Sequence, residues 1–360
     1  MSPIYICVLI VTTALGFAAE ANPILLRKKD GRAYVQPDKV SAILLASFLI
    51  LVSGFRYRVG TDYMAYYRWV VSDASKVLNN IIWFREGGFS LLAFLSRVIY
   101  NHGQTLIFFS AVITIGLYCR TIYKYHDMFL VSMLLYILMG EWQGSFNGIR
   151  QYLAAAIVFT GHRYILSRDW LKYGLVVLAA SLFHTTAIIM IVPFFIFTRK
   201  ADIRQLVVLA IGSVIIRFSY DLIFSIIGNY KGKVMNVLGD SYLTNSVSIY
   251  RILVAFIPVL IYVFLCRKIN HTKEQNFYVN AFFFHAFSMF AGMGSTYFGR
   301  IGIYTSAVPI IGYGFLFQLI DDERTRRVTI YAAMVMFLLY WIYSIKAGGL
   351  GNFQWIFNNL

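Results

Sequence analysis

Continuous apolar stretches recur from end to end of the chain, and short polar segments separate them. A helix needs about 20 mostly apolar residues to cross the roughly 30 Å hydrocarbon layer of a bilayer. Continuous runs favour helices over the strands of a membrane barrel, because those strands alternate apolar and polar residues. We therefore predict twelve transmembrane helices, near residues 4–19, 40–55, 104–119, 128–143, 150–166, 170–183, 185–198, 204–218, 249–266, 276–293, 300–320 and 328–345.

The composition supports this prediction. Of the 360 residues, 59% are hydrophobic and 13% are charged, and the mean hydropathy is +0.67. Soluble domains carry about 25% charged residues, so an ordinary soluble enzyme is excluded. The apolar content excludes a disordered chain, and three widely separated cysteines exclude a disulfide-stapled module. We expect one all-α membrane domain over residues 1–360, with about twelve (11–13) helices.

Basic residues orient the predicted helices. The chain holds 32 Lys and Arg against 16 Asp and Glu, a net charge of +16. Six short connections hold 19 of these basic residues: 20–39, 120–127, 162–172, 199–204, 267–274 and 321–327. Cytoplasmic loops carry an excess of Lys and Arg, so we place these connections in the cytoplasm and both termini outside. The first apolar run lacks a charged leader and a cleavage site, which indicates an uncleaved span.

The segment 81–101 is apolar enough for a further span, yet it contains Arg85, Glu86 and Arg97. A span here would reverse every later connection and break the positive-inside pattern. We therefore predict an interfacial or re-entrant helix on the outer side. The two long outer segments, 56–101 and 219–248, are predicted to be substrate-binding loops.

The outer side is also basic. It holds 13 basic and six acidic residues, and nine of the basic residues are arginines. The arginine fork suits phosphate and keeps its charge when it is partly desolvated. Arg97 and Arg217 are expected to snorkel to lipid headgroups. For the other arginines, the excess predicts an anionic, phosphate-bearing ligand.

The richest outer stretch directly follows the second predicted span. Residues 55–67 contain two arginines and four tyrosines. Gly60-Thr61-Asp62 predicts a turn followed by a helix N-cap. A cap with aromatic packing would explain Thr61 or Asp62 alone, but not this concentration of arginine and tyrosine. Aromatic rings beside cations and a carboxylate are typical of a sugar-binding site.

Three further clusters lie at predicted outer ends of helices. Arg150 and Gln151 fall in the first turn of a small-residue helix, where backbone N–H groups and the helix dipole favour anions. His184 interrupts two apolar half-length runs, and there a functional and a structural role are equally compatible with the pattern. Arg300 opens a helix from the outer side. His285, in the middle of a predicted span, is expected to be a satisfied interior group.

Five segments carry a resemblance to a known family: Arg56-Tyr-Arg-Val-Gly-Thr-Asp-Tyr63 with Tyr66, Glu86-Gly-Gly-Phe89, Asn147-Gly-Ile-Arg150-Gln151, Ser181-Leu-Phe-His184, and Arg300 with Tyr304. In order and spacing over roughly residues 45–310, they resemble the EpsG family of polysaccharide-assembly proteins, relatives of Wzy-type O-antigen polymerases. The resemblance implies a GT-C-like glycosyltransferase of the bacterial inner membrane. Its site would face the periplasm or exterior and join polyprenyl-diphosphate-linked oligosaccharide repeat units of O-antigen, capsule or exopolysaccharide.

Inverting glycosyl transfer needs a base for the acceptor hydroxyl and cations for the leaving diphosphate. The six outer acids are dispersed, so we expect no metal and no other cofactor. Arginines are predicted to bind the diphosphate instead: Arg56, Arg58, Arg150 and Arg300. The predicted base is Asp62 or His184, and Glu86 is a weaker candidate because it can pair with an arginine. Sugar rings are predicted to contact Tyr63, Tyr66, Tyr67, Asn147, Gln151 and Tyr304.

The partners implied are the polyprenyl-diphosphate-linked oligosaccharide and membrane lipid, together with a chain-length regulator and a flippase of the same pathway; no nucleic acid is expected. A lipid-linked oligosaccharide flippase or transporter is the main alternative, but it would show repeat symmetry and charges along a path through the bilayer. A membrane O-acyltransferase would need a histidine near its donor, and His184 leaves that alternative open. An O-antigen ligase would differ only in its acceptor. No GxSxG or HExxH motif supports a protease.

Overall fold

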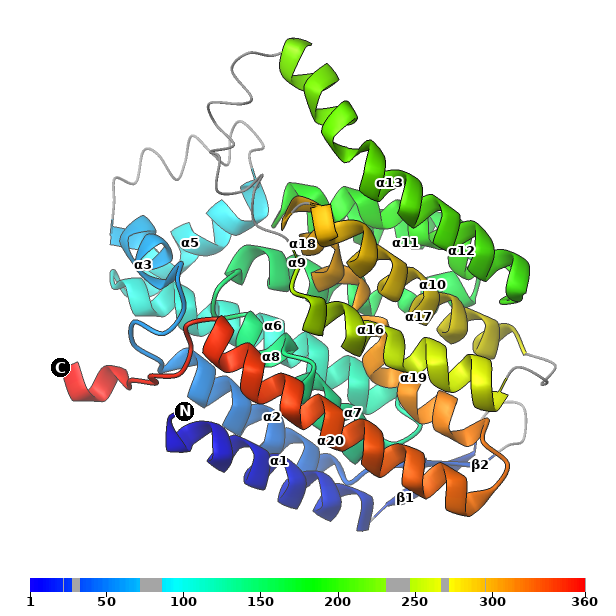
Figure 1. Ribbon diagram of the computed structural model, residues 1–360. Coiled ribbons are helices and arrows are strands. Elements are labelled where there is room, and N and C mark those ends of the chain that lie inside the picture. The colour runs from blue at the N-terminus through cyan, green and yellow to red at the C-terminus, as the bar shows by residue number, and fades with distance from the viewer. Residues whose placement is uncertain are drawn as a thin grey trace. The chain divides into compact units, whose positions relative to one another are not determined.

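The computed structural model describes residues 1–21, 23–27, 33–71, 86–230, 247–266, 272–294 and 296–359. Within this part of the chain almost all residues are helical, as Figure 1 shows. The described chain divides into two compact units. The first unit comprises residues 1–191 and 337–360, and the second unit comprises residues 192–336.

The first unit is a bundle in which α1 packs against α2 and α7, α2 packs against α6, and α6 packs against α9. Its elements are α1 (Pro3–Ala21), β1 (Ile24–Arg27), β2 (Ala33–Gln36), α2 (Lys39–Gly54), α3 (Tyr63–Val71), α5 (Gly87–Ile99), α6 (Gly103–Tyr125), α7 (Phe129–Leu138), α8 (Glu141–Gly144), α9 (Ile149–Thr160), α10 (His162–Leu166), α11 (Trp170–Ser181), the 3-10 helix η1 (Thr185–Ile191) and the 3-10 helix η4 (Ile356–Asn359). Local capping defines several boundaries: Asp38 caps α2 through Ser41, and Asp169 caps α11 through Lys172.

The second unit is organised around α17, which contacts α12, α13, α16, α18 and α19. Its elements are α12 (Val192–Phe197), α13 (Ile203–Tyr230), α16 (Ile249–Ile261), the π-helix η2 (Tyr262–Cys266), α17 (Lys273–Ala291), the 3-10 helix η3 (Gly292–Gly294), α18 (Thr296–Thr305) and α19 (Ala307–Gln318). A reciprocal capping box between Thr272 and Gln275 starts α17. The last long helix, α20 (Glu323–Ala347), begins in the second unit and ends in the first.

The described helices confirm a helical membrane protein but not the predicted number of spans. Four are long and apolar enough to cross a bilayer: Pro3–Ala21, Gly103–Tyr125, Ile249–Cys266 and Glu323–Ala347. A fifth span is obtained if α18 and α19, which are bent by 56°, count as one. The twelve-span count is therefore not confirmed for the described part of the chain.

Short or interrupted helices account for much of this difference. The stretch predicted as a span near 150–166 forms α9 and α10, which separate at Gly161. The stretch near 185–198 forms one short apolar helix, Thr185–Phe197, in which η1 continues directly into α12. The stretch near 128–143 keeps only the 10 residues of α7, after which Gly140 adopts a φ of +93°. Hydropathy records how apolar a segment is but not where its helix ends, so these stretches had the same pattern as spans.

The structure adds detail to three predicted connections. The helix α13 continues to Tyr230, well into the outer segment predicted at 219–248, because the apolar run resumes after Asp221; residues 231–246 of that segment lie outside the described residues. An antiparallel hairpin, β1–β2, lies within the basic connection 20–39. In the segment 81–101, α5 has 13 residues and is about 20 Å long, too short to cross a bilayer; residues 81–85 are outside the described part.

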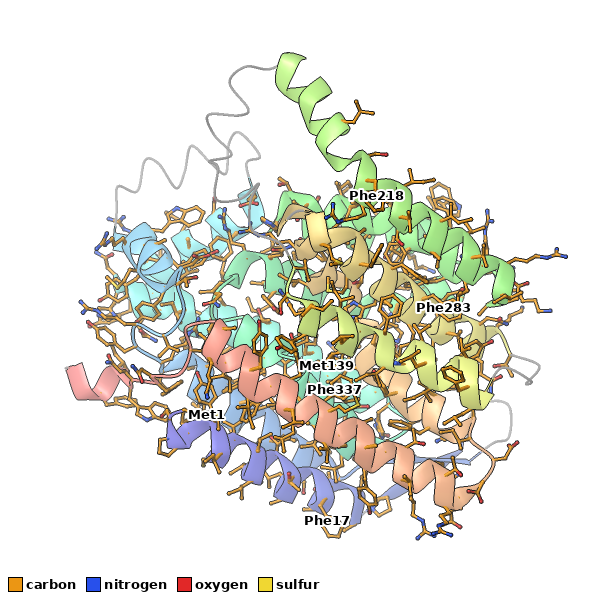
Figure 2. The ribbon with its side chains drawn as sticks, in the orientation of Figure 1. Met1, Phe17, Met139, Phe218, Phe283 and Phe337 are labelled. Atoms are coloured by element: carbon orange, nitrogen blue, oxygen red, sulfur yellow. The ribbon has the colours of Figure 1, made fainter. Side chains whose placement is uncertain are left out.

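Side-chain exposure on α1 fits a helix that faces lipid. Ile6, Ile10 and Phe17 are 51%, 63% and 66% exposed, whereas Tyr5 and Val8 are fully buried. Phe17 is labelled in Figure 2. An exposed face made of large apolar residues is costly in water and favourable in hydrocarbon. The exposure pattern therefore agrees with the assignment of α1 as a membrane span.

Candidate active site

A tight turn sets the position of α3. Gly60 has a φ of +104°, and the N–H of Thr61 donates to Oδ1 of Asn147 at 2.9 Å. A Cβ at residue 60 would lie 2.3 Å from the carbonyl oxygen of Phe146. Glycine is thus required both for the backbone conformation and for the close approach. The helix α3 begins directly afterwards, so the predicted turn followed by a helix is confirmed.

Arg56 is buried beneath this turn, with 2% of its surface exposed. Its Nη1 donates to the carbonyl oxygen of Ser53 at 2.5 Å, and its Nε donates to that of Val59 at 3.3 Å. The guanidinium lies 4.6 Å from the ring centre of Phe146. Burial lowers the pKa of Arg56 to about 10, which leaves it charged at neutral pH. Burial and hydrogen bonds to backbone carbonyls and to the Ser53 hydroxyl favour a structural role for Arg56 over contact with a diphosphate.

The C-terminal tail holds the segment around Arg56. The N–H of Tyr57 donates to the carbonyl oxygen of Gln354 at 2.8 Å, and the N–H of Ile356 donates to that of Phe55 at 3.0 Å. These two hydrogen bonds join segments almost 300 positions apart in sequence. The segment 55–57, which leads from α2 to α3, is therefore held in place by residues 354–356 as well as by α2.

Arg58 and Asp62, the other charged residues of this turn, are exposed. Arg58 has a φ of +52°, and its guanidinium lies 5.2 Å from the ring centre of Tyr57. The carboxylate of Asp62 accepts a hydrogen bond from the hydroxyl of Thr61 at 3.2 Å. Both charges are thus open to a ligand at the surface of the first unit.

One side of α3 packs against the start of α6. Tyr63 is fully buried, and its hydroxyl donates to Oε1 of Gln104 at 2.5 Å. Tyr67 stacks on Tyr63 with ring centres 6.0 Å apart, and its hydroxyl lies 2.9 Å from Nε2 of His102. Gly103 makes this packing possible, because a Cβ there would lie 2.4 Å from the Tyr67 ring. Tyr63 is a core residue here, whereas Tyr67 is only half-buried.

The other side of α3 forms an aromatic wall. Tyr66 stacks on Trp69 with ring centres 6.4 Å apart, and Phe89 of α5 lies 5.7 Å from Tyr66 and 5.3 Å from Trp69. Figure 1 shows α3 and α5 beside one another, and the two helices are in contact. Arg150 of α9 lies over this wall, with its guanidinium carbon 5.8 Å from the Tyr66 ring centre and 5.4 Å from that of Trp69.

Glu86, at the start of α5, joins this wall to the break after α11. One carboxylate oxygen, Oε2, forms an ion pair with Nη1 of Arg150. The other, Oε1, accepts from Nδ1 of His184 at 2.7 Å and from the N–H of Thr185 at 3.3 Å. The Glu86 and His184 side chains are 13% and 16% exposed, and that of Arg150 is 35% exposed. Three groups taken from separate sequence clusters thus form one contact network.

The Glu86-Gly-Gly-Phe89 segment positions Glu86 beside His184. The N–H of Gly88 donates to the carbonyl oxygen of Leu182 at 2.9 Å. A Cβ at residue 88 would lie 3.1 Å from Cβ of Leu182, so glycine permits the close approach. Phe89 is fully buried and anchors the first turn of α5. The start of α5 is therefore docked on the chain break that carries His184.

The protonation state of Glu86 is controlled by these neighbours. Partial burial opposes its ionisation, but the hydrogen bond from His184 and the charge of Arg150 outweigh burial, and the pKa of Glu86 lies below its ordinary value. Glu86 is therefore ionised at neutral pH. An ionised carboxylate only accepts hydrogen bonds, so the proton of a neutral His184 lies on Nδ1 and Nε2 is left as the acceptor.

This charge state leads to a prediction about stability. A group whose pKa is lowered by folding stabilises the protein above its unfolded pKa, about 4.3 for glutamate, and loses this effect as the pH falls through the folded value. Glu86→Gln is expected to lower the melting temperature in detergent by about 2 °C at pH 7, and this difference should narrow as the pH falls below about 4.3. Scanning fluorimetry of both proteins from neutral to acidic pH measures the difference. A difference in melting temperature that does not narrow toward acidic pH would contradict the assignment.

The remaining predicted residues fall in two places. In the first unit, Asn147 serves the turn at Thr61 and also donates through Nδ2 to the carbonyl oxygen of Gly348 at 3.4 Å, and Gln151 is buried in α9. Arg300 and Tyr304 belong to α18 in the second unit. There Arg300 is exposed and Tyr304 is buried.

His285, also in the second unit, is buried, and its Nδ1 lies 2.9 Å from the hydroxyl oxygen of Thr305. The expectation of a satisfied interior group is confirmed.

Trp69 was not among the residues predicted from the sequence. Its signal was available, because Trp69 lies three positions after Tyr66 and so on the same face of a helix. Within the described ranges, no group of three or more His, Cys, Asp or Glu side chains is placed to hold a metal ion. The groups that do converge are an arginine, a histidine and a shared carboxylate beside an aromatic wall.

Comparison with known proteins identifies the family. No curated protein and no solved structure matches this chain. The sequence model of the EpsG family matches residues 39–357, a range that includes every residue of the contact network and most of both units. The chain therefore belongs to the EpsG family.

Proposed function

We propose that this protein is a polysaccharide polymerase that joins polyprenyl-diphosphate-linked oligosaccharide repeat units on the outer face of the bacterial inner membrane. Family membership supports polysaccharide assembly in a membrane. The observation that carries the finer proposal is the network in which Glu86 binds both Arg150 and His184. It combines a cation suited to phosphate with an imidazole held by a carboxylate, beside rings on which a sugar can stack.

In the proposed reaction the acceptor is the terminal hydroxyl of one lipid-linked unit, and the donor is the chain on a second lipid. The acceptor oxygen attacks C1 of the donor sugar, and its proton passes to Nε2 of His184. The bond between C1 and the diphosphate oxygen breaks, and its electron pair leaves with polyprenyl diphosphate. Arg150 stabilises the charge that develops on this leaving group. The new glycosidic bond has inverted configuration.

The exposure of the other side chains indicates which of them a substrate could contact. Arg58 is an exposed cation that can add to the diphosphate site. Tyr67 and Trp69, which are only partly buried, offer ring surfaces to sugars, whereas Tyr66 is buried in the core. His184 is preferred over Asp62 as the base because Glu86 orients it, whereas Asp62 contacts Thr61. Arg300, Tyr304, Asn147 and Gln151 remain predicted contacts of the donor and acceptor chains.

The proposal includes the topology expected from the sequence, namely a GT-C-like membrane domain with twelve helices and both termini outside. Contacts within the first unit support this sidedness. The N–H of Ser2 donates to the carbonyl oxygen of Gly351 at 2.9 Å, and the tail after Gly351 pairs with residues 55–57, next to α3. Both termini thus lie at the end of the first unit that carries the candidate site. A chain-length regulator and a flippase are the proposed protein partners.

Gel analysis of surface polysaccharide in a deletion strain tests the proposed function. A strain that lacks the polymerase is expected to display single repeat units in place of long chains on its surface polysaccharide carrier. The gene supplied on a plasmid is expected to restore the long chains. Loss of all exported material would instead indicate a flippase. Repeat chains of normal length that lack only a substituent would indicate an O-acyltransferase. Either of these two results would refute the polymerase proposal.

A further inference from the structure

Both carboxylate oxygens of Glu86 are already engaged. One pairs with Arg150, and the other accepts from the imidazole of His184 and from the N–H of Thr185. A base must offer a free lone pair to the hydroxyl that it deprotonates. If Glu86 took a proton, the ion pair with Arg150 and the hydrogen bond with His184 would both weaken. The geometry therefore suits a group that holds its neighbours in place, not one that reacts.

The backbone of Glu86 supports the same conclusion. Its φ of 53° and ψ of 45° lie in the left-handed region, which non-glycine residues rarely adopt. Such a conformation persists only when the surrounding structure maintains it, and such conformations cluster at functional sites. Here the docking of Gly88 on Leu182 maintains it. The conformation places the carboxylate between Arg150 of α9 and the break that carries His184.

We infer that Glu86 is a positioning residue of the proposed transfer, which keeps the proton of His184 on Nδ1 and holds Arg150 beside the imidazole. Nε2 is then the atom that takes the acceptor proton, and the carboxylate stabilises the imidazolium that forms. This inference rests on the proposed function and replaces the interpretation of Glu86 as a base. It also explains why the Glu86-Gly-Gly segment and His184, which are almost 100 positions apart in sequence, are in direct contact.

The charged and titratable groups around His184 come from several elements. Glu86 starts α5, Arg150 lies in α9, and Tyr66 of α3 accepts from Nε of Arg150 at 3.4 Å. The helix α11, which precedes His184, carries Lys172 and Tyr173 about three turns away. Among the described residues, Glu86 is thus the negative charge in direct contact with the imidazole, and its removal is expected to dominate any change in the pH dependence of the reaction.

The test uses the purified full-length protein in nanodiscs and lipid-linked repeat units extracted from the deletion strain. Chain elongation is followed from pH 5 to pH 9 for wild type, Glu86→Gln and Glu86→Asp. Glu323→Gln is the matched control, because Glu323 forms an exposed ion pair with Arg327 at 3.5 Å. If the wild type fails to elongate these units, the proposed function fails. If the wild type elongates them, the variants test the inference alone.

Glu86→Gln is expected to lower the elongation rate by about 10²- to 10⁴-fold. The acid limb of its pH–rate profile should also move to lower pH, because loss of the carboxylate disfavours the protonated imidazole. Glu86→Asp should recover part of the rate, and Glu323→Gln should behave as wild type. A uniform loss with an unmoved acid limb would mean a merely structural role and overturn the inference. So would a rate for Glu86→Gln equal to that of Glu323→Gln.

Glu86→Gly provides a second test, which applies even if the glutamine variant does not accumulate in membranes. Glycine suits the left-handed backbone and leaves space where the carboxylate was. Added formate is expected to raise the elongation rate of Glu86→Gly several-fold and to leave the wild-type rate unchanged. Absence of rescue in a folded Glu86→Gly protein would overturn the inference.

Discussion

Replacing Arg150 with alanine is expected to reduce the surface polysaccharide from long chains to single repeat units. In the structure the Arg150 guanidinium pairs with Glu86 and lies over Tyr66 and Trp69, while about a third of the side chain is exposed. Loss of a cation that stabilises a leaving diphosphate costs on the order of 100-fold in rate. At that rate, chain elongation would no longer keep pace with export. Gel analysis of the complemented deletion strain measures the chain-length distribution.

Two further variants separate the role of Arg150 from a general effect of charge. Arg150→Lys keeps the charge but loses the fork and is expected to retain only short chains. Arg97→Ala is the matched control, since Arg97 lies on α5 in the same unit and its Nη1 contacts the carbonyl oxygen of Val70 at 3.4 Å. It is expected to support chains of normal length. Full-length chains from Arg150→Ala, at wild-type protein levels, would remove Arg150 from the diphosphate site.

The second large effect is expected at Gly60. Alanine at this position would have to adopt a φ of +104° and would place its Cβ 2.3 Å from the carbonyl oxygen of Phe146. Backbone strain and steric overlap together should lower the free energy of unfolding by about 3 kcal/mol or more. The turn also carries the N–H of Thr61 that binds Asn147, so α3 should lose its anchor to the start of α9. The expected result is low membrane abundance and no long polysaccharide chains.

Gly116→Ala is the control for this substitution. Gly116 lies within α6, and a Cβ there would meet no atom within 4 Å. Alanine has the higher helix propensity, so membrane abundance and melting temperature should equal or exceed those of the wild type. Comparing both variants by immunoblot and scanning fluorimetry isolates the contribution of the turn. A Gly60→Ala protein as stable as Gly116→Ala would show that the turn can relax.

The local features of the candidate site could be predicted from sequence because each depends on neighbouring residues. The turn at Gly60 needs only the Gly-Thr-Asp signal, and the place of Arg150 in the first turn of α9 follows from the apolar run that begins after it. The break around His184 was visible as a polar interruption between two apolar runs. The concentration of tyrosines after α2 predicted a sugar-binding site, which stays a prediction; in the structure Tyr66 packs against Trp69.

Which of these residues face one another could not be predicted, because that depends on how helices distant in sequence pack. Arg56 and Arg58 are two positions apart and have the same chemistry, yet Arg56 is buried against backbone carbonyls and Arg58 is exposed. The C-terminal tail, more than 290 positions away, lies beside the first of them. Likewise Glu86 was expected to pair with some arginine, but hydropathy contains nothing that selects Arg150.

The number of membrane spans likewise depends on more than local sequence. The apolarity of a segment predicts that it avoids water, and this was enough to identify a membrane protein. It does not report a φ of +93° at Gly140 or the separation of α9 from α10 at Gly161, because these depend on the packing around each glycine. A Cβ at Gly161 would lie 2.9 Å from the Val176 side chain.

By itself, the sequence determined that this is a helical membrane protein, and it predicted an arginine-rich outer face and clusters typical of polysaccharide assembly. Those properties are sums over residue type and spacing, which a linear pattern contains. Only the tertiary structure decided that Glu86, Arg150 and His184 form one network and that Arg56 does not take part. The physical reason is that a contact between side chains needs two backbone positions within a few ångströms, and helix packing alone brings α5, α9 and the break after α11 that close.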